Sequence, residues 1–237
     1  MKKNQMVVSG QSKTLYESEK PENLVLEFRD DFTASTGRKR KISGRAESNN
    51  AISSFLFEFL ESYHVPTHFV KRLDSQHMLV HRLEMIPVRV LIRNVAAGKF
   101  CNYFNFKEGT VLDYPVIELY LKRGSSDEPF INEHHLYALH HTIPSEMRTI
   151  ERMASKINAL LKSFFQRRNL QLVELNVEFG RNKGKLLTGD EISSDSCVLW
   201  DGITHEKYNL DYLNKEPKDL EKVYKHMQSR ILGGEER

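Results

Sequence analysis

The stretch from Leu172 to Glu191, LVELNVEFGRNKGKLLTGDE, constrains the fold of this chain more than any other. Its first half alternates apolar and polar side chains, and a period of two is typical of a half-buried β-strand. Residues 182–184, Asn-Lys-Gly, favour a turn, and residues 185–188 can return as a second strand. The alternation consists of apolar Val173, Leu175, Val177 and Phe179 and polar Glu174, Asn176 and Glu178. The sequence therefore predicts an antiparallel hairpin.

Two carboxylates of this hairpin are candidates for a metal site. Glu178 and Asp190 each lie six positions from Gly184, so a turn centred on that glycine would place them directly opposite each other. Opposed residues on antiparallel strands have Cβ atoms roughly 4.5–5.5 Å apart, and like charges at that distance repel. A proton or a cation would relieve the repulsion, and oxygen-only ligands favour magnesium or manganese. The spacing alone leaves a second interpretation open, in which both are solvated charges on an exposed sheet face.

The wider pattern resembles a known enzyme family. The run L-V-E-L-N-V-E-F-G is similar to the signature L-V-D-x-K-x-E-F-G of phosphoribosylaminoimidazole-succinocarboxamide synthase, or SAICAR synthase. Five more segments resemble motifs of that family in the expected order: 10–16 (G-K-x-K-x-x-Y), 48–50 (an N-N helix start), 93–98 (R-N-x-A-A-G), 120–122 (a segment with a phosphate-reaching lysine) and 199–201 (L-W-D). The chain is therefore identified, by resemblance, as a member of the SAICAR synthase family.

The resemblance implies an α+β fold with two lobes. A smaller N-terminal lobe, residues 1–84, would carry an antiparallel sheet that covers the nucleotide. A larger α+β lobe, residues 85–237, would carry the hairpin and the pocket for the acceptor substrate. ATP would lie in the cleft between the lobes, and the crossing near Leu83–Pro87 would contact the adenine.

The resemblance also assigns residues to ATP and magnesium. Lysines and magnesium neutralise charge during phosphoryl transfer, and the protein contributes little covalent chemistry. Glu178 and Asp190 would hold the magnesium ion under the ATP phosphates, and together with Lys13 and Lys122 they would form the catalytic set. Gln11 stands where the family usually has a lysine. The nucleotide-binding set would be Gly10, Ser12, Lys13, Leu15, Leu83, Met85 and Lys122.

The family's reaction joins a carboxylate to an amine in purine biosynthesis. ATP phosphorylates a carboxylate of the imidazole nucleotide CAIR, and the amine of L-aspartate then displaces phosphate to form an amide. The resemblance implies that this chain is a ligase of the same kind, acting through an acyl phosphate. Its substrate-binding set would be Arg93, Lys99, Glu174 and Asn176, with Arg93 at the phosphate of the nucleotide.

Several residues expected around the acceptor differ from the family pattern. Glu174-Leu175-Asn176 replaces D-x-K, which removes a lysine expected to face the nucleotide's carboxylate. Lys99 replaces a common serine and Val198 replaces an arginine, both phosphate ligands in the family, and Arg123-Gly124 replaces an acidic pair. Lys99 could restore the charge lost at Val198, whereas nothing visible in the sequence replaces the lysine lost at Asn176. Three interpretations stay open: a SAICAR synthase with compensating residues, a paralogue that joins a different acid or amine, and a nucleotide-binding protein without catalysis.

Composition narrows the class of protein. With 237 residues, 39% of them hydrophobic and 28% charged, the chain can bury a sizeable core. No apolar run approaches the roughly 18 residues of a membrane span, and the N-terminus lacks a signal peptide's apolar region. Cys101 and Cys197 lie outside any CxxC pattern, which suggests a reducing compartment, and a net charge of +3 is too small to indicate a nucleic-acid protein. We expect a cytoplasmic protein that takes small-molecule substrates, without nucleic-acid or membrane partners, and we leave a homo-oligomer open.

Periodicity and turn signals place the remaining elements. A helix should begin at a Ser48 cap and end near Tyr63, and the longest helix should begin at Ser145. Pro217 suits the first position of a C-terminal helix, and residues 33–44 are expected to form a loop. Strands are expected at residues 24–28, 67–73, 78–83, 88–92 and 115–121.

Two further groups of residues suggest other ligands. The basic run 38–41 could reach phosphates, but it has no interleaved aromatic residues for base stacking, so solvated charges are the favoured interpretation. His64 with His68, and His77 with His81, have the i,i+4 spacing of metal ligands. The second pair lies in a predicted strand, and no cysteine or acidic cluster completes a zinc site. Zinc is therefore disfavoured.

Overall fold

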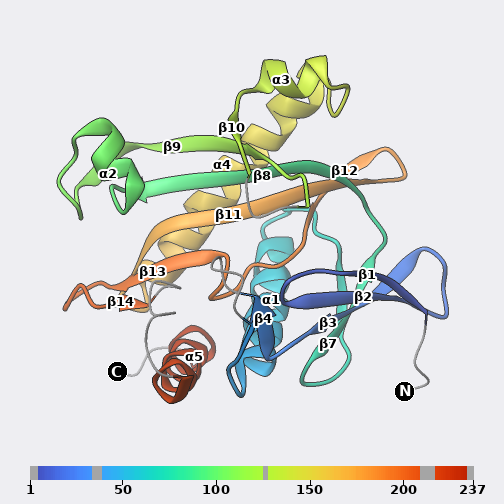
Figure 1. Ribbon diagram of the computed structural model, residues 1–237, viewed down its shortest axis with the longest axis horizontal. Coiled ribbons are helices and arrows are strands. Elements are labelled where there is room, and N and C mark those ends of the chain that lie inside the picture. The colour runs from blue at the N-terminus through green and yellow to red at the C-terminus, as the bar shows by residue number, and fades with distance from the viewer. Residues whose placement is uncertain (1–4, 34–38, 125–127, 209–216, 234–237) are drawn as a thin grey trace.

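The computed structural model describes residues 5–33, 39–124, 128–208 and 217–233 (Figure 1). The N-terminal part forms an antiparallel five-stranded sheet in the order β1-β2-β3-β7-β6. A separate hairpin pairs β4 with β5. The strands are β1 (Met6–Ser9), β2 (Lys13–Glu17), β3 (Asn23–Phe28), β4 (Asp31–Thr33), β5 (Lys39–Lys41), β6 (Phe69–Arg72) and β7 (His77–His81).

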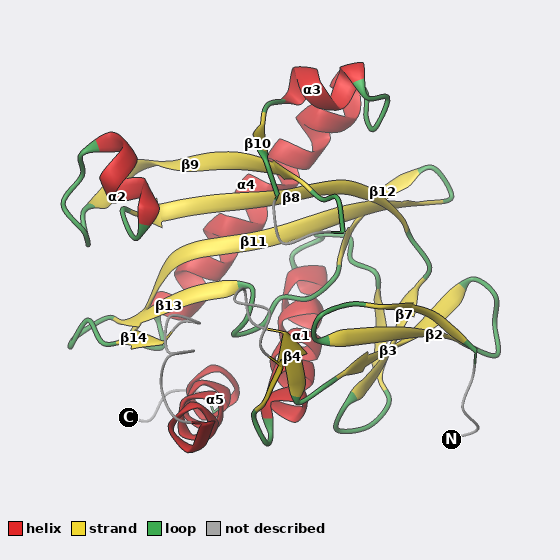
Figure 2. Ribbon diagram, in the orientation of Figure 1, coloured by secondary structure: helices red, strands yellow, loops and turns green. Residues whose placement is uncertain are grey.

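The rest of the chain builds a second, larger antiparallel sheet. Its order is β10-β9-β8-β11-β13-β14, and β12 pairs with β11 beyond the end of β13. Long β8, β9 and β11 form its centre, as Figure 2 shows. The strands are β8 (Glu84–Val95), β9 (Val111–Leu121), β10 (Phe130–Ile131), β11 (Leu170–Asn182), β12 (Lys185–Gly189), β13 (Cys197–Asp201) and β14 (Lys207–Tyr208).

Helices cover these sheets. The longest, α4 (Pro144–Gln166), packs across the large sheet against β11, and its apolar residues recur at helical spacing on the buried face. α1 (Arg45–Ser62) packs on the small sheet and against α5 (Pro217–Leu232). The short helices are α2 (Lys99–Phe104) and α3 (Glu133–Ala138). None of the described helices combines the length and apolar character needed to cross a membrane.

One apolar core runs through both sheets. Leu26 of the small sheet, Phe57 of α1 and Leu175 of the large sheet belong to the same cluster of buried side chains. The chain changes from one sheet to the other between β7 and β8, at residues 82 and 83. The division into lobes 1–84 and 85–237 stays a prediction, because the shared core gives no independent boundary.

The structure corrects two predicted elements. α1 begins at Arg45 rather than after a Ser48 cap, and Gly44, with φ 77°, precedes it. Ser48 Oγ instead donates to the carbonyl of Tyr224, 3.1 Å away, so this polar first part of the helix packs on α5. The predicted loop at 33–44 contains the strand β5, while Arg38 of its basic run lies outside the described residues. The other predicted strands and helices are present, with ends that differ by a few residues, and β8 is markedly longer than predicted.

Candidate active site

The β11–β12 hairpin has a two-residue turn. Lys183 and Gly184 both have positive φ, 49° and 75°, which matches the twist of a tight antiparallel hairpin. Asn182 therefore pairs with Lys185, and Glu178 pairs with Gly189. The predicted pairing of Glu178 with Asp190 is wrong by one residue, because the turn is centred between Lys183 and Gly184 rather than on the glycine.

Asp190 nevertheless lies in the same cavity as Glu178, because of its own backbone conformation. It directly follows β12 and adopts φ 59°, a left-handed conformation that aspartate tolerates better than most residues. Both carboxylates line the same cavity. Strained backbone of this kind clusters at functional sites, where the surrounding structure holds it in place. The hairpin thus brings together the two predicted metal ligands.

Two lysines neutralise these carboxylates. Lys13, at the start of β2, places its Nζ 2.6 Å from Oδ1 of Asp190 and 2.7 Å from Oε1 of Glu191. Lys122, just after β9, places its Nζ 2.6 Å from Oε1 of Glu178. The four predicted catalytic residues therefore form two ion pairs, one of which joins the small sheet to the hairpin.

The electrostatics of this group distinguish its members. Burial, together with the nearby charge of Asp190, raises the pKa of Glu178 to about 7 despite the opposing effect of Lys122. Burial works against the charges of Lys13 and Asp190, but Asp190 and Glu191 together raise the pKa of Lys13, and Lys13 with Lys122 lowers the pKa of Asp190. Glu178 can therefore gain or lose a proton near neutral pH, and a cation in this cavity would favour its charged form.

The cavity that contains these groups, here called the nucleotide pocket, has a volume of about 250 Å³ and is lined from both sheets. One part is apolar and the other contains the two ion pairs, an arrangement that suits a base at one end and phosphates at the other. Six of the seven predicted nucleotide-binding residues line it, and Ser12 does not. The predicted lining residues are Gly10, Lys13, Leu15, Leu83, Met85 and Lys122, joined by Leu24, Leu26, His68 and Val80 among others.

Two glycines of the hairpin allow the 83–85 crossing to pack directly on it. A Cβ added at Gly180 would lie 2.8 Å from Leu83 Cβ and 3.1 Å from Met85 Sδ. A Cβ at Gly189 would lie 2.9 Å from Leu83 Cδ1. Since Leu83 and Met85 line the nucleotide pocket, the close packing of these glycines against them helps to set the shape of the pocket.

The residues present fit magnesium with a nucleotide. Glu178 and Asp190 offer carboxylate oxygens, and magnesium is usually bound by one or two protein carboxylates, with water and phosphate oxygens completing the shell. Within the described ranges, no group of three or more His, Cys, Asp or Glu residues is arranged to hold a metal ion. The donor set therefore suits an ion that arrives with phosphate groups.

A second cavity, the acceptor pocket, has a volume of about 300 Å³ and contains all four predicted substrate-binding residues. Arg93 lies between two acids: its Nε is 3.0 Å from Oε2 of Glu118, and its Nη1 donates to Glu174. Lys99 begins α2, and among the described residues it has no ion-pair partner. Asn176 accepts a hydrogen bond of 2.6 Å from Arg89. A cation thus stands beside the position from which the family's lysine is missing.

Sequence reasoning missed several residues of these pockets. Glu191 directly follows Asp190. Arg89 lies in the predicted strand 88–92, four positions before Arg93 and therefore on the same strand face, so local patterns could have indicated both residues. His68 is buried in the nucleotide pocket, where burial lowers its pKa to about 4. Asp195 of the acceptor pocket accepts a hydrogen bond of 2.5 Å from Tyr224 and one from Asn49, contacts between distant segments that no local pattern reveals.

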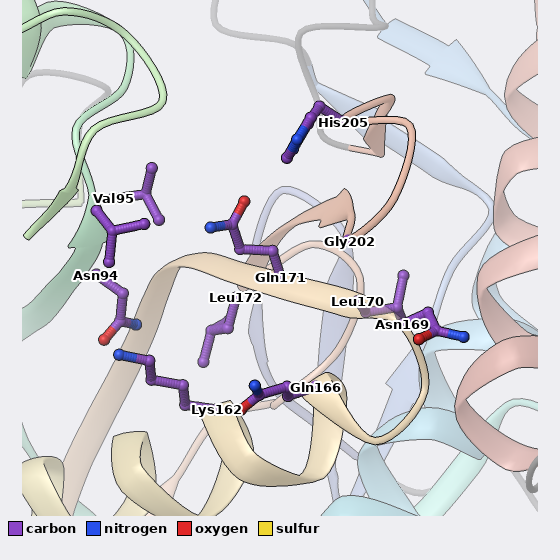
Figure 3. A pocket seen from close by; sticks show the side chains of 11 residues that line it. Asn94, Val95, Lys162, Gln166, Asn169, Leu170, Gln171, Leu172, Gly202 and His205 are labelled. Atoms are coloured by element: carbon purple, nitrogen blue, oxygen red, sulfur yellow. The ribbon is translucent and has the colours of Figure 1, made fainter.

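A third cavity lies apart from both pockets (Figure 3). Its volume is about 520 Å³, and it is bordered by Asn94 of β8, Gln171 of β11 and the end of α4, where Lys162 and Gln166 point toward it. None of the predicted site residues lines it. Although it is larger than the other two, its lining contains no carboxylate to pair with Lys162 or to bind a metal ion, so we place the active site elsewhere.

Comparisons with known proteins identify the family of this chain. The family model described as SAICAR synthetase matches residues 6–231. Phosphoribosylaminoimidazole-succinocarboxamide synthase of Chlorobaculum tepidum is 40% identical over 233 residues, which cover 98% of this chain and 99% of that protein. The enzyme of the same description from Enterococcus faecalis is 39% identical over 234 residues, again 98% and 99%.

Solved structures show the same fold. The phosphoribosylaminoimidazole-succinocarboxamide synthase of Ehrlichia chaffeensis superposes with a TM-score of 0.91 at 29% identity, covering 96% of this chain and 98% of that chain. A SAICAR synthetase in complex with ADP superposes with a TM-score of 0.91 at 32% identity, covering 98% and 100%. These matches confirm the predicted α+β fold. This chain belongs to the SAICAR synthetase family.

Proposed function

We propose that this protein is an ATP-dependent ligase that joins the carboxylate of CAIR to the amine of L-aspartate, forming SAICAR, ADP and phosphate. One observation carries the proposal: the two pockets meet on one face of β11. Glu178 lines the nucleotide pocket and Asn176 lines the acceptor pocket. Residues two apart on a strand share a face and lie roughly 7 Å apart. A phosphoryl group held at Glu178 is therefore within reach of a carboxylate held beside Asn176.

The relatives support both halves of the reaction. Proteins 39–40% identical over nearly the full chain are described as phosphoribosylaminoimidazole-succinocarboxamide synthases. A structure that is 32% identical is described as a complex with ADP. Together with the charged and apolar ends of the nucleotide pocket, this supports ATP as the nucleotide.

The chemistry needs activation of a poor acyl donor. A carboxylate oxygen of CAIR attacks the γ-phosphorus of ATP, the bond to ADP breaks, and an acyl phosphate forms. The amine nitrogen of aspartate then attacks the acyl carbon, phosphate leaves, and the nitrogen loses a proton. Lys13 and Lys122 neutralise phosphate charge in this scheme. Glu178 and Asp190 would hold a magnesium ion, which supplies further positive charge to the phosphates when it is bound.

The acceptor pocket offers cations for the nucleotide's phosphate. Lys99 has no ion-pair partner among the described residues. It is the first residue of α2 and follows Gly98, the N-cap residue, whose φ is 56°. Arg93 lies in the same cavity but already faces Glu118 and Glu174. We assign Lys99 the larger share of phosphate binding and give Arg93 the positioning of Glu174.

The proposal is tested by product formation. The protein is incubated with CAIR, L-aspartate, ATP and magnesium, and SAICAR and ADP are measured by mass spectrometry, with each substrate omitted in turn. We expect SAICAR and ADP in equal amounts only when all are present, and no turnover in a folded Lys13→Met variant. Binding of ADP with magnesium but no SAICAR from the unaltered protein would overturn the proposal.

A second candidate is a paralogue that ligates another carboxylate or amine. Glu174, Asn176 and Val198 all line the acceptor pocket, and each departs from the family pattern. A mass-spectrometric screen with CAIR and varied amines, and with other carboxylates, distinguishes the two. SAICAR as the dominant product excludes the paralogue, whereas a different amide made faster than SAICAR supports it.

Location and partners stay predictions. Cys101 and Cys197 are both free, as a cytoplasmic protein would have them. We propose that the protein works there on small molecules, without nucleic-acid or membrane partners, and a homo-oligomer stays open.

A further inference from the structure

One face of the large sheet bears charges between the two pockets. In the register of β8 with β11, Arg93 pairs with Glu174, Leu91 with Asn176, and Arg89 with Glu178. These side chains share a face, because residues two apart on a strand point the same way. Arg89 therefore lies opposite a residue of the nucleotide pocket and bonds to a residue of the acceptor pocket.

The contacts of Arg89 hold its guanidinium in one orientation. Nε donates to Oε2 of Glu128 at 2.6 Å, and Nη1 donates to Oδ1 of Asn176 at 2.6 Å. The guanidinium carbon lies 4.4 Å from the centre of the Tyr120 ring. The side chain is 25% exposed, so it is neither solvated on the surface nor enclosed in the core.

Part of the guanidinium is free to bind a ligand. An arginine has five N–H donors, and two are used by Glu128 and Asn176. Within the described part of the chain, the donors of Nη2 and the second donor of Nη1 have no hydrogen-bond partner. Glu128 occupies the Nε edge, which leaves the edge formed by the two terminal nitrogens. That edge matches the two oxygens of a carboxylate.

We propose that Arg89 binds the carboxylate of the acceptor substrate that becomes phosphorylated, and that Asn176 positions Arg89 for this contact. The inference rests on the proposed function and deepens it. A lysine at position 176, as the family pattern has, would present its charge from β11. Here the charge comes from β8, the neighbouring strand, and the neutral amide at 176 accepts a hydrogen bond from it instead of repelling it.

The test compares four proteins: the unaltered chain, Arg89→Gln, the double variant Arg89→Gln with Asn176→Lys, and Arg152→Gln as the control at an exposed arginine of α4. Steady-state kinetics give KM for CAIR, ATP and aspartate, and calorimetry gives the affinity for ADP with magnesium. Arg89→Gln should raise KM for CAIR roughly 10- to 100-fold, because a hydrogen bond to a charged group is lost. The affinity for ADP should change less than about twofold.

The double variant separates binding from structural support. It moves the cation from β8 to β11. KM for CAIR should therefore be at least tenfold lower in the double variant than in Arg89→Gln. A structural arginine would instead lower the melting temperature and the ADP affinity together, and a lysine on another strand would not restore KM.

A nucleotide without the carboxylate gives an independent readout. 5-Aminoimidazole ribonucleotide shares the ring and phosphate of CAIR but lacks the group that Arg89 is proposed to bind. Its inhibition constant should be equal in the unaltered chain and Arg89→Gln, whereas it should rise in Lys99→Ser. An equal rise for both nucleotides in Arg89→Gln, or an unchanged KM for CAIR, would overturn the inference while leaving the proposed ligase intact. No turnover of CAIR by the unaltered protein would overturn the proposed function, and the inference with it.

Discussion

The nucleotide pocket and the acceptor pocket lie on the same face of β11, but their charges are arranged differently. In the nucleotide pocket, each lysine contacts a carboxylate of the hairpin region directly, Lys13 with Asp190 and Lys122 with Glu178. In the acceptor pocket, Arg93 is held by two acids, Lys99 has no ion pair among the described residues, and a neutral Asn176 is bound to an arginine from the next strand.

The comparison indicates in which of the two pockets a charged residue can be replaced by one on another strand. The carboxylates of the nucleotide pocket depend on a tight turn, on two glycines and on a left-handed aspartate, so their positions are fixed by backbone geometry. The cation beside Asn176 only needs to lie on the right face of the sheet. Arg89 and Asn176 are diagonal neighbours on adjacent strands, and such neighbours lie roughly 7–8 Å apart, within reach of a long side chain, so a charge can move between strands and still reach the same ligand.

The largest effect should come from Lys122. Replacing it with alanine removes a cation next to Glu178, and losing a group aimed at developing phosphoryl charge typically costs on the order of 100-fold or more in rate. The side chain of Lys122 is 39% exposed, so the fold should tolerate the change. Arg152→Ala, at an exposed position of α4, serves as the control for kcat. Near-normal turnover in Lys122→Ala would remove this lysine from the catalytic set.

Glu178→Gln should weaken magnesium-dependent ADP binding by about 10- to 100-fold without unfolding the protein, since it removes one of two proposed ligands and relieves a repelling carboxylate pair. Calorimetry with ADP, with and without magnesium, measures the change. Magnesium-dependent affinity equal to that of the unaltered chain would contradict the metal role of the hairpin.

The magnesium-dependent affinity for ADP should depend on pH, and the pKa of Glu178 sets the direction of that dependence. The metal binds the charged form of Glu178, whose pKa is raised to about 7 mainly by burial, so protons compete with the metal. Affinity should therefore fall as pH decreases below 7, by up to about tenfold per unit, and level off above it. Glu178→Gln should lack this component of the profile. A profile that is flat between pH 6 and 8 in the unaltered protein would show that Glu178 is already charged.

Gly180→Ala tests whether the hairpin shapes the nucleotide pocket. The new Cβ would meet Leu83 Cβ at 2.8 Å and the carbonyl of Glu84 at 3.0 Å, so the 83–85 crossing must shift. Overpacking of this kind typically costs about 1–3 kcal/mol. We expect a lower melting temperature and roughly tenfold weaker ADP binding, because that crossing lines the pocket. Lys185→Ala, exposed on β12 of the same hairpin, should leave both unchanged.

The sequence predicted the nucleotide pocket better than the details of the hairpin. Alternation located β11 and β12, and the motif positions brought Lys13, Lys122, Glu178 and Asp190 together. It did not give the register, because the turn type depends on positive φ at Lys183, which a lysine does not signal as asparagine or glycine would. Asp190 reaches the pocket through its own left-handed backbone, a property that no periodicity reveals.

The acceptor pocket was harder to predict because its charges come from several strands. Arg89 and Asn176 are 87 positions apart, and their contact follows only from the register of β8 with β11. Similarly, the start of α1 is set by its packing on α5, more than 150 residues away, rather than by its own serine. Local patterns identify a strand face, whereas the partner across the sheet needs the fold.

The smallest expected effects concern the phosphate end of the acceptor pocket. Val198 lines this cavity, and an arginine there would add a cation to a pocket in which Lys99 is the unpaired one. Val198→Arg should lower KM for CAIR by a few fold, whereas Lys99→Ser should raise it by about tenfold, the usual range for a charged hydrogen bond. Asn176→Lys alone should not help, because its ammonium would lie beside the guanidinium of Arg89. If Lys99→Ser leaves KM unchanged while Val198→Arg lowers it, the phosphate is bound beside Val198 without a contact from Lys99, and Lys99 loses its proposed role.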